Sequence, residues 1–151
     1  MAHYPLNHHL RQAYRALAGA AGLYLALAGI FGIAASWGND FLGRGGGEWV
    51  LGVRTNPGGA VLTTLIGAAI LAAAALGGNL HHRVNLVLSW AVIAIATIML
   101  ALLRTDANIL DFSMVTVIVW IVLGLVVLTA ALYGKVGSEK NQRTEAKAAL
   151  G

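Results

Sequence analysis

Two kinds of residue are scarce in this sequence, and each scarcity excludes a class of protein or site. The chain has no cysteine, which rules out disulfide bonds and thiolate metal sites. Only 11% of its 151 residues are charged, whereas a soluble domain carries about 25%. A chain with so few charges lacks the polar surface that a soluble fold turns to water. Hydrophobic residues make up 58% instead, and this balance predicts an integral membrane protein.

The few charges are also segregated, and they leave four long charge-free intervals: residues 16–39, 55–82, 84–103 and 112–134. A helix needs about 20 apolar residues to cross roughly 30 Å of hydrocarbon, and each interval is that long. Backbone groups in lipid must be satisfied within the chain, and the runs show no period-two alternation, so helices are favoured. We therefore predict an all-α integral membrane protein with four transmembrane helices, at about 16–37, 57–79, 84–103 and 112–133.

We expect the four predicted helices to form one domain, residues 1–137, and residues 138–151 to form a charged, mobile cytoplasmic tail. A cleaved signal peptide is the alternative for the first apolar run, because Arg11 and Arg15 precede it and Ala34-Ala35-Ser36 resembles a cleavage site. The run is longer than the roughly 7–15 apolar residues of a signal sequence. A retained helix is therefore favoured.

The distribution of Lys and Arg predicts the orientation in the membrane. Seven of the ten basic residues fall on the side of the termini: Arg11, Arg15, Arg83, Lys135, Lys140, Arg143 and Lys147. Three fall on the other side: Arg44, Arg54 and Arg104. We expect a bacterial plasma-membrane protein with both termini in the cytoplasm. The net charge of +4 follows from this bias, so it indicates no nucleic-acid partner.

Two polar clusters lie in the loops predicted on the outer side: Arg54, Thr55 and Asn56 in the first, and Arg104, Thr105 and Asp106 in the third. Asn56 is a favoured helix N-cap and Pro57 suits the first helical position, and Asp111 can cap the last helix in the same way. The arginines can anchor to headgroups or pair with Asp106 and Asp111. This reading, helix starts with interfacial anchors, is the favoured one. A sharper hypothesis makes Arg54 and Arg104 a joint site for an anionic lipid or solute headgroup.

The long first loop contains a glycine run followed by Trp49, Val50 and Leu51. No Lys-Ser or Lys-Thr follows the glycines, so the phosphate-binding P-loop pattern fails. We expect a flexible turn, with residues 49–51 returning to the bilayer surface as a short interfacial segment.

Paired histidines occur twice, and each pair precedes an apolar run: His8 and His9, then His81 and His82. With the arginines, the order is His-His, Arg, helix, Arg-Thr, helix, which suggests a tandem two-helix repeat. The four histidines could gather at the inner face and bind a metal or a b-type haem. Axial histidines of a haem normally come from within helices of a bundle, however, and adjacent histidines point in different directions. Ligand-free interfacial histidines are favoured, and no cofactor is expected.

Small residues recur along two of the predicted helices and indicate close helix packing. The stripes are Ala18, Gly22, Ala26 and Gly29 on the first helix, and Thr64, Ala68, Ala72 and Ala75 on the second. The last helix is bulky and β-branched, which suits lipid or a protein partner. The same stripes could instead mediate self-association.

Catalytic groups are scarce in the predicted spans. No Asp, Glu, Lys, Arg or His lies in the middle of any span, which disfavours ion-coupled transport. A Ser-His-Asp triad is implausible, because the histidines are expected inside and the aspartates outside. The sequence therefore does not predict an enzyme.

Four blocks resemble a known family: MAHYPLNHHLRQAYRALAG, WVLGVRTNPGGAVL, LALLRTDANILDFSMVTV and LTAALYGKVG. Together they are similar to the actinobacterial membrane-protein family catalogued as domain of unknown function 4383, over residues 1–137. The resemblance implies a small four-helix plasma-membrane protein of high-GC Gram-positive bacteria. It brings no catalytic or binding residues.

Two hypotheses of function follow. The first is a non-enzymatic accessory or scaffold subunit of a membrane assembly, in contact with membrane lipids and with a membrane-protein partner or a second copy of itself. The alternative is a protein that binds or transports a lipid or small solute through Arg54 and Arg104.

Overall fold

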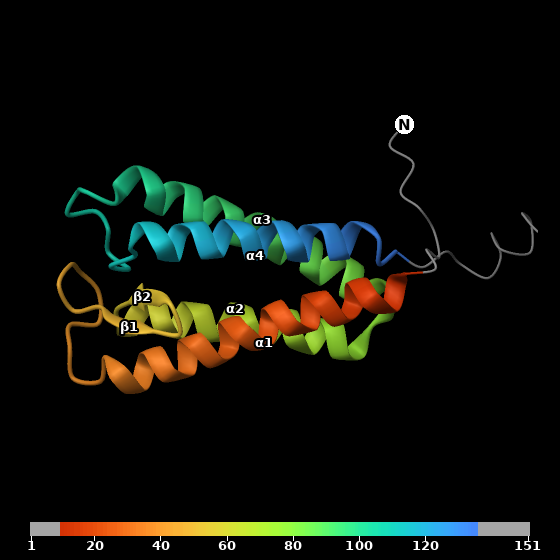
Figure 1. Ribbon diagram of the computed structural model, residues 1–151, viewed down its shortest axis with the longest axis horizontal. Helices are drawn as coiled ribbons and strands as arrows, with labels where there is room; N and C mark the ends of the chain where they lie inside the picture. Colours follow the sequence, from red (N-terminus) through yellow and green to blue (C-terminus); the bar gives the residue numbers. More distant parts are fainter. Residues whose placement is uncertain (1–9, 136–151) are drawn as a thin grey trace, which may run out of the picture.

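The computed structural model describes residues 10–135, and this part of the chain folds into four helices and one small hairpin (Figure 1). In chain order the elements are α1 (Arg11–Ala35), β1 (Glu48–Val50), β2 (Val53–Thr55), α2 (Pro57–Leu76), α3 (Gly78–Leu102) and α4 (Met114–Leu132). Each of these helices is long and apolar enough to cross a membrane. The predicted four-helix architecture is confirmed at this level. The tail predicted at 138–151 lies outside the described residues.

Two helices begin earlier than predicted. α1 starts at Arg11 rather than near residue 16, and α3 starts at Gly78 rather than near residue 84. Only Gly77 separates α2 from α3, and its φ of +71° is one that glycine adopts without strain. His81, His82 and Arg83, which we expected before the third helix, therefore lie on the first turns of α3.

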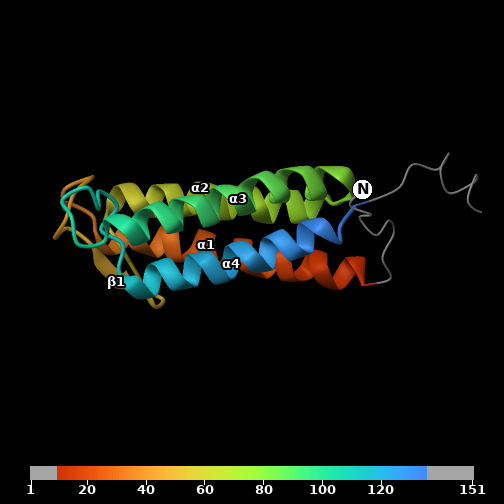
Figure 2. The ribbon, with the colours of Figure 1, turned by 90° about the horizontal axis from the view of Figure 1, so that it is seen from above.

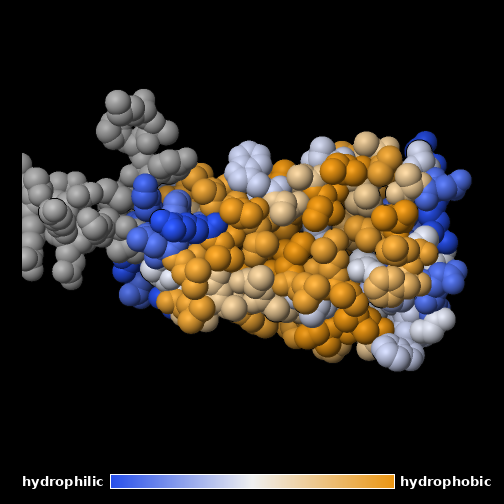
Figure 3. All heavy atoms as spheres, turned by 180° about the vertical axis from the view of Figure 1, so that it is seen from behind, coloured by the Kyte–Doolittle hydropathy of each residue, from blue (hydrophilic) through white to orange (hydrophobic). Residues whose placement is uncertain are grey.

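The helices form two antiparallel pairs that pack side by side. In Figure 1 the pair α3/α4 lies above the pair α1/α2, and the view from above separates α2 and α3 from α1 and α4 (Figure 2). The start of α1 and the end of α4 share one end of the bundle, the terminal end, and the loops with β1 and β2 form the other, the hairpin end. Apolar surface covers the length of the bundle between two hydrophilic ends (Figure 3), as a membrane-spanning bundle requires.

Helices α1 and α2 are in backbone contact at their glycines. A Cβ added to Gly22 would lie 2.7 Å from the backbone nitrogen of Leu71, and one added to Gly29 or Gly67 would also meet backbone atoms of the opposite helix. Small residues permit such close approach and are the usual means of helix association in lipid. The stripe predicted on α1, which is Ala18, Gly22, Ala26 and Gly29, is buried.

The stripe predicted on α2 is misplaced. Ala68, Ala72 and Ala75 are exposed, and only Thr64 is half-buried. The buried residues lie on the neighbouring face, which includes Gly67, Ile70 and Ala74. The physical reason is that small residues surround α2 on every side, so their spacing cannot select the face that packs.

Helix α4 uses one face for the core and leaves another exposed. Trp120 is fully buried and its ring lies 5.0 Å from that of Phe112, between their centroids. Gly124 gives room to Ile93 of α3, since an added Cβ would lie 2.6 Å from that side chain. Exposed residues such as Val122 and Leu125 cover the opposite face. The bulky sequence of α4 thus serves both the core and the apolar surface.

Residues 49–51, which we expected to form a short interfacial segment, belong to the hairpin of β1 and β2. Trp49 pairs with Arg54 and Val50 with Val53 in an antiparallel register. The turn has φ angles of 49° at Leu51 and 85° at Gly52, and two positive values mark a type I′ turn. The Tyr24 hydroxyl donates a hydrogen bond to the Leu51 carbonyl over 2.8 Å. Because α1 continues to Ala35, this contact places the turn about 16 Å back along α1 from the helix end.

Candidate functional site

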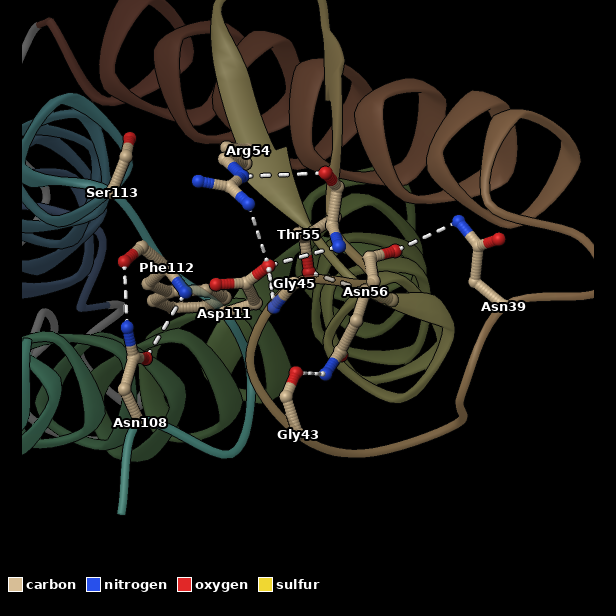
Figure 4. A network of polar contacts seen from close by, with 12 residues as sticks. Asn39, Gly43, Gly45, Arg54, Thr55, Asn56, Asn108, Asp111, Phe112 and Ser113 are labelled. Atoms are coloured by element: carbon tan, nitrogen blue, oxygen red, sulfur yellow. Dashed lines mark hydrogen bonds and ion pairs between the residues drawn. The ribbon is translucent and has the colours of Figure 1, made fainter. Parts of the chain in front are cut away.

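The most extensive polar cluster of the described residues lies at the hairpin end and centres on Asp111 (Figure 4). One carboxylate oxygen, Oδ2, accepts hydrogen bonds from Gly45 N at 3.1 Å, Gly47 N at 2.9 Å and Arg54 Nη2 at 3.0 Å. The Asp111 side chain is only 6% exposed, whereas that of Arg54 is 33% exposed. A buried carboxylate with three donors, one of them charged, has its charge compensated within the chain.

Asn56 connects three segments. Its Oδ1 accepts from Gly59 N at 2.9 Å, which caps α2 as predicted, and Pro57 occupies the first helical position. Its Nδ2 donates to Ile109 O at 2.7 Å and to Gly43 O at 3.1 Å. Asn56 therefore holds the start of α2 against the α1–β1 loop and the α3–α4 loop.

The Thr116 hydroxyl forms hydrogen bonds with the backbone N–H and C=O of Arg54 on the outer edge of β2. It accepts from Arg54 N at 2.7 Å and donates to Arg54 O at 3.0 Å. An unpaired strand edge among apolar side chains leaves polar backbone groups without partners, and one threonine of α4 removes that problem at Arg54. The hairpin end of α4 is thus fixed to the hairpin.

The start of α4 differs from the prediction. Asp111 does not cap the helix, because its carboxylate is engaged by Arg54 and the two glycines. Ser113 is the cap instead, since its Oγ accepts from Thr116 N at 3.1 Å. Asp111 itself has a φ of +50°. Buried Asn108 closes the loop before it, with Oδ1 accepting from Phe112 N and Nδ2 donating to Phe112 O.

The two clusters predicted as a joint ligand site have different surroundings. Arg54, Thr55 and Asn56 belong to the network just described, and Thr55 and Asn56 are buried. Arg104, Thr105 and Asp106 are exposed. Thr105 bonds back to Leu102 O, and Asp106 lies 3.9 Å from Arg44 in an exposed ion pair of little energetic weight. The contacts of Arg54 therefore run to Asp111 and to the Gly47 carbonyl, not to Arg104.

The described histidines lie at the terminal end on α3. His82 Nδ1 lies 2.7 Å from the Ala131 carbonyl, and His81 Nδ1 lies 2.8 Å from Asn85 Nδ2. His81 Nε2 and Asn85 Oδ1 are buried and have no hydrogen-bond partner. Within residues 10–135 no group of three or more His, Asp or Glu could hold a metal ion. His8 and His9, the rest of the predicted histidine group, lie outside the described residues.

Sequence reasoning missed Asn108, Asn85 and the roles of Asp111, Ser113 and Thr116. Asn85 carried a usable signal, because it is the one carboxamide within a charge-free interval of 20 residues at 84–103. The pairing of Thr116 with Arg54 carried none, since 62 residues separate them.

Comparison of the chain with protein-family models, curated proteins and solved structures gives no match. The resemblance to the family of unknown function and the tandem two-helix repeat stay predictions. Function must therefore be argued from the geometry of the chain itself.

Proposed function

We propose that this protein is a non-enzymatic accessory or scaffold subunit of a plasma-membrane assembly, with both termini in the cytoplasm. The supporting observation is the closed network at the hairpin end. Arg54, Asp111, Asn56 and Thr116 find their partners within the chain, so the network is built for rigidity. A catalytic or solute-binding site would instead need polar groups that are available to a ligand.

The network also fixes a surface that a partner could use. It holds the α1–β1 loop through Gly43, Gly45 and Gly47. The same loop region presents Trp37 and Phe41, which are 82% and 60% exposed. Exposed aromatic side chains on a rigid support are typical anchors of protein contacts, and they also suit the membrane interface.

The alternative, a lipid or solute bound by Arg54 and Arg104, has less support. The guanidinium of Arg54 is occupied by Asp111 and Gly47. A ligand anion would have to displace a carboxylate that has three donors and is nearly buried.

Native extraction tests the proposal. The tagged chain is purified from its own membrane in a mild detergent and analysed by mass spectrometry, together with the double variant Trp37→Ala/Phe41→Ala. We expect a stoichiometric protein partner with the wild type and its loss in the double variant. The control is Trp90→Ala, an exposed tryptophan in the middle of α3, which should keep the partner. Absence of any reproducible partner contradicts the proposal.

The absence of cysteine makes the orientation directly testable. Single cysteines are introduced by Asp40→Cys at the hairpin end and Lys135→Cys at the terminal end. A membrane-impermeant maleimide applied to intact cells should label Asp40→Cys and leave Lys135→Cys unlabelled until the cells are opened. The reverse pattern would show that the termini are outside.

A further inference from the structure

The terminal end has basic residues and no acid within the described chain. Arg11, Arg15, Arg83 and Lys135 lie there, whereas the four acids of residues 10–135 all lie on the hairpin side: Asp40, Glu48, Asp106 and Asp111. Such an excess of one sign raises the local potential and attracts anions.

A cavity of about 220 Å³ opens among these basic groups. It lies between the start of α1, the start of α3 and the second residue after α4, and its walls are Arg11, Gln12, Arg15, Gly78, His81 and Gly134. A second hollow of about 430 Å³ shares Gln12 and Arg15 and continues between α1 and α2, along Gly19 and Leu71. The first cavity is lined mostly by polar side chains, and the second extends it along an apolar groove between α1 and α2.

His81 supplies an unsatisfied polar atom in the wall of this cavity. The residue is 1% exposed, and its Nε2 is buried and has no hydrogen-bond partner of normal geometry. The carbonyl of Ala130 lies near the ring and acts on it as a backbone hydrogen-bond acceptor, but Nε2 makes no hydrogen bond of normal geometry. The ring edge is turned toward Gly134, because a Cβ added there would lie 3.0 Å from Nε2. Buried polar atoms nearly always have partners, so an orphan at a cavity wall points to a group that is not part of the described chain.

The hydrogen-bond pattern makes Nε2 a donor. Asn85 Nδ2 lies 2.8 Å from His81 Nδ1 and can only donate, so Nδ1 accepts and the ring hydrogen lies on Nε2. Arg11 is half-buried, and its guanidinium makes no hydrogen bond or ion pair with the described residues. Arg15 adds fixed positive charge, since its Nε and Nη2 donate to the carbonyls of Ala74 and Ala75 at the end of α2.

We propose that this cavity binds a phosphate-type anion, held by Arg11 and by His81 Nε2–H in the field of Arg15. Planar guanidinium groups match phosphate oxygens in paired hydrogen bonds. The anion is either the phosphodiester headgroup of an anionic lipid or free inorganic phosphate. The adjoining groove between α1 and α2 favours the lipid, because it offers room for an acyl chain beside the headgroup. The site is independent of the proposed scaffold function.

The test measures binding of two probes to the full-length protein in a neutral detergent. The probes are short-chain phosphatidylglycerol and inorganic phosphate, and short-chain phosphatidylcholine serves as the neutral lipid. The variants are Arg11→Gln, which removes a wall cation, and Gly134→Ala, whose added Cβ would lie 2.7 Å from His81 Cδ2 and so would displace the ring without a change of charge. The matched control is Arg83→Gln, because it removes the same charge from an exposed position on α3 outside the cavity.

We expect Arg11→Gln to raise the Kd by about tenfold or more, the effect of losing one charge-assisted contact. Gly134→Ala should weaken binding as well, and Arg83→Gln should leave the Kd within about twofold. Phosphatidylglycerol binding that survives an excess of inorganic phosphate assigns the site to the lipid, and competition by phosphate assigns it to the free anion. Equal effects of Arg11→Gln and Arg83→Gln would mean attraction to surface charge alone and would overturn the site. So would a wild-type protein that binds neither probe, or that binds the neutral lipid equally well.

Discussion

Both ends of this molecule carry buried or half-buried polar residues, but these residues have partners within the chain at the hairpin end and lack some of them at the terminal end. At the hairpin end Arg54 forms an ion pair with the buried carboxylate of Asp111. Backbone amides of the α1–β1 loop and the hydroxyl of Thr116 complete the network. At the terminal end Arg11 has no acid to pair with among the described residues, and His81 and Asn85 keep unsatisfied buried atoms. Polar chemistry in a membrane bundle thus serves two purposes, and the number of satisfied partners distinguishes a closed structural network from an open site.

Removal of the Asp111 carboxylate should disrupt the network at the hairpin end and cause the largest loss of stability. Asp111→Asn leaves the part-buried charge of Arg54 without compensation and weakens the bonds from Gly45 and Gly47. We expect a loss of about 2–3 kcal/mol in the free energy of unfolding. Reversible unfolding in mixed micelles measures it. Asp106→Asn is the control, because its ion pair with Arg44 is exposed and should not contribute measurably. Equal behaviour of the two variants would contradict the structural role of Asp111.

A smaller loss should follow when the strand edge loses its partner. Thr116→Val keeps the shape of the side chain but leaves the N–H and C=O of Arg54 unpaired. The expected cost is about 1–2 kcal/mol. The same substitution at Thr129 is a close control on the same helix, since that hydroxyl is exposed and bonds only to Leu125 O one turn earlier. If Thr129→Val lowers the free energy of unfolding as much as Thr116→Val does, the contact of Thr116 with the hairpin does not stabilise the fold beyond an ordinary helix hydroxyl.

The smallest effect is expected at the open end. The double variant His81→Leu/Asn85→Leu removes both members of a buried pair in which Nε2 and Oδ1 have no partner, and replacement of both partners of a poorly satisfied polar pair by apolar groups is close to neutral. The stability of the delipidated protein should change by less than about 0.5 kcal/mol. Unfolding under the same conditions as for Asp111→Asn permits direct comparison. A loss as large as that of Thr116→Val would mean that the His81–Asn85 pair is satisfied after all.

The positions of the helices were predictable from the sequence, because they depend on the distribution of charged and apolar residues. Charge-free intervals located the helices, and Asn56-Pro57 located the start of α2, because a helix start depends on local residues. The buried stripe of α1 was predictable too, since small residues line one of its faces. The same argument failed on α2, where small residues occur on all faces.

The partners within the candidate site were not predictable. Arg54 bonds to a carboxylate 57 residues away, and Asp106 was an equally plausible partner from sequence. The hairpin has strands of three residues, which are too short for a periodic pattern. Its turn places Leu51 at a positive φ, whereas the usual sequence signal for a type I′ turn is Asn-Gly. Long-range pairs and short strands are set by tertiary contact, and single-sequence patterns do not carry that information.

The separation of Arg54 from Asp111 along the chain also sets an order of assembly during synthesis. A ribosome adds about 5–20 residues per second, so Asp111 follows Arg54 by roughly 3–11 seconds. Throughout that interval the arginine lacks the partner that it has in the fold, and Thr116 has not yet been made to close the edge of β2. The first two helices can associate through their glycines as soon as both are inserted. The contact of the hairpin turn with Tyr24 needs only residues made before α4, whereas the partners of Arg54 are made last, so the last helix and the loop before it complete the network at the hairpin end.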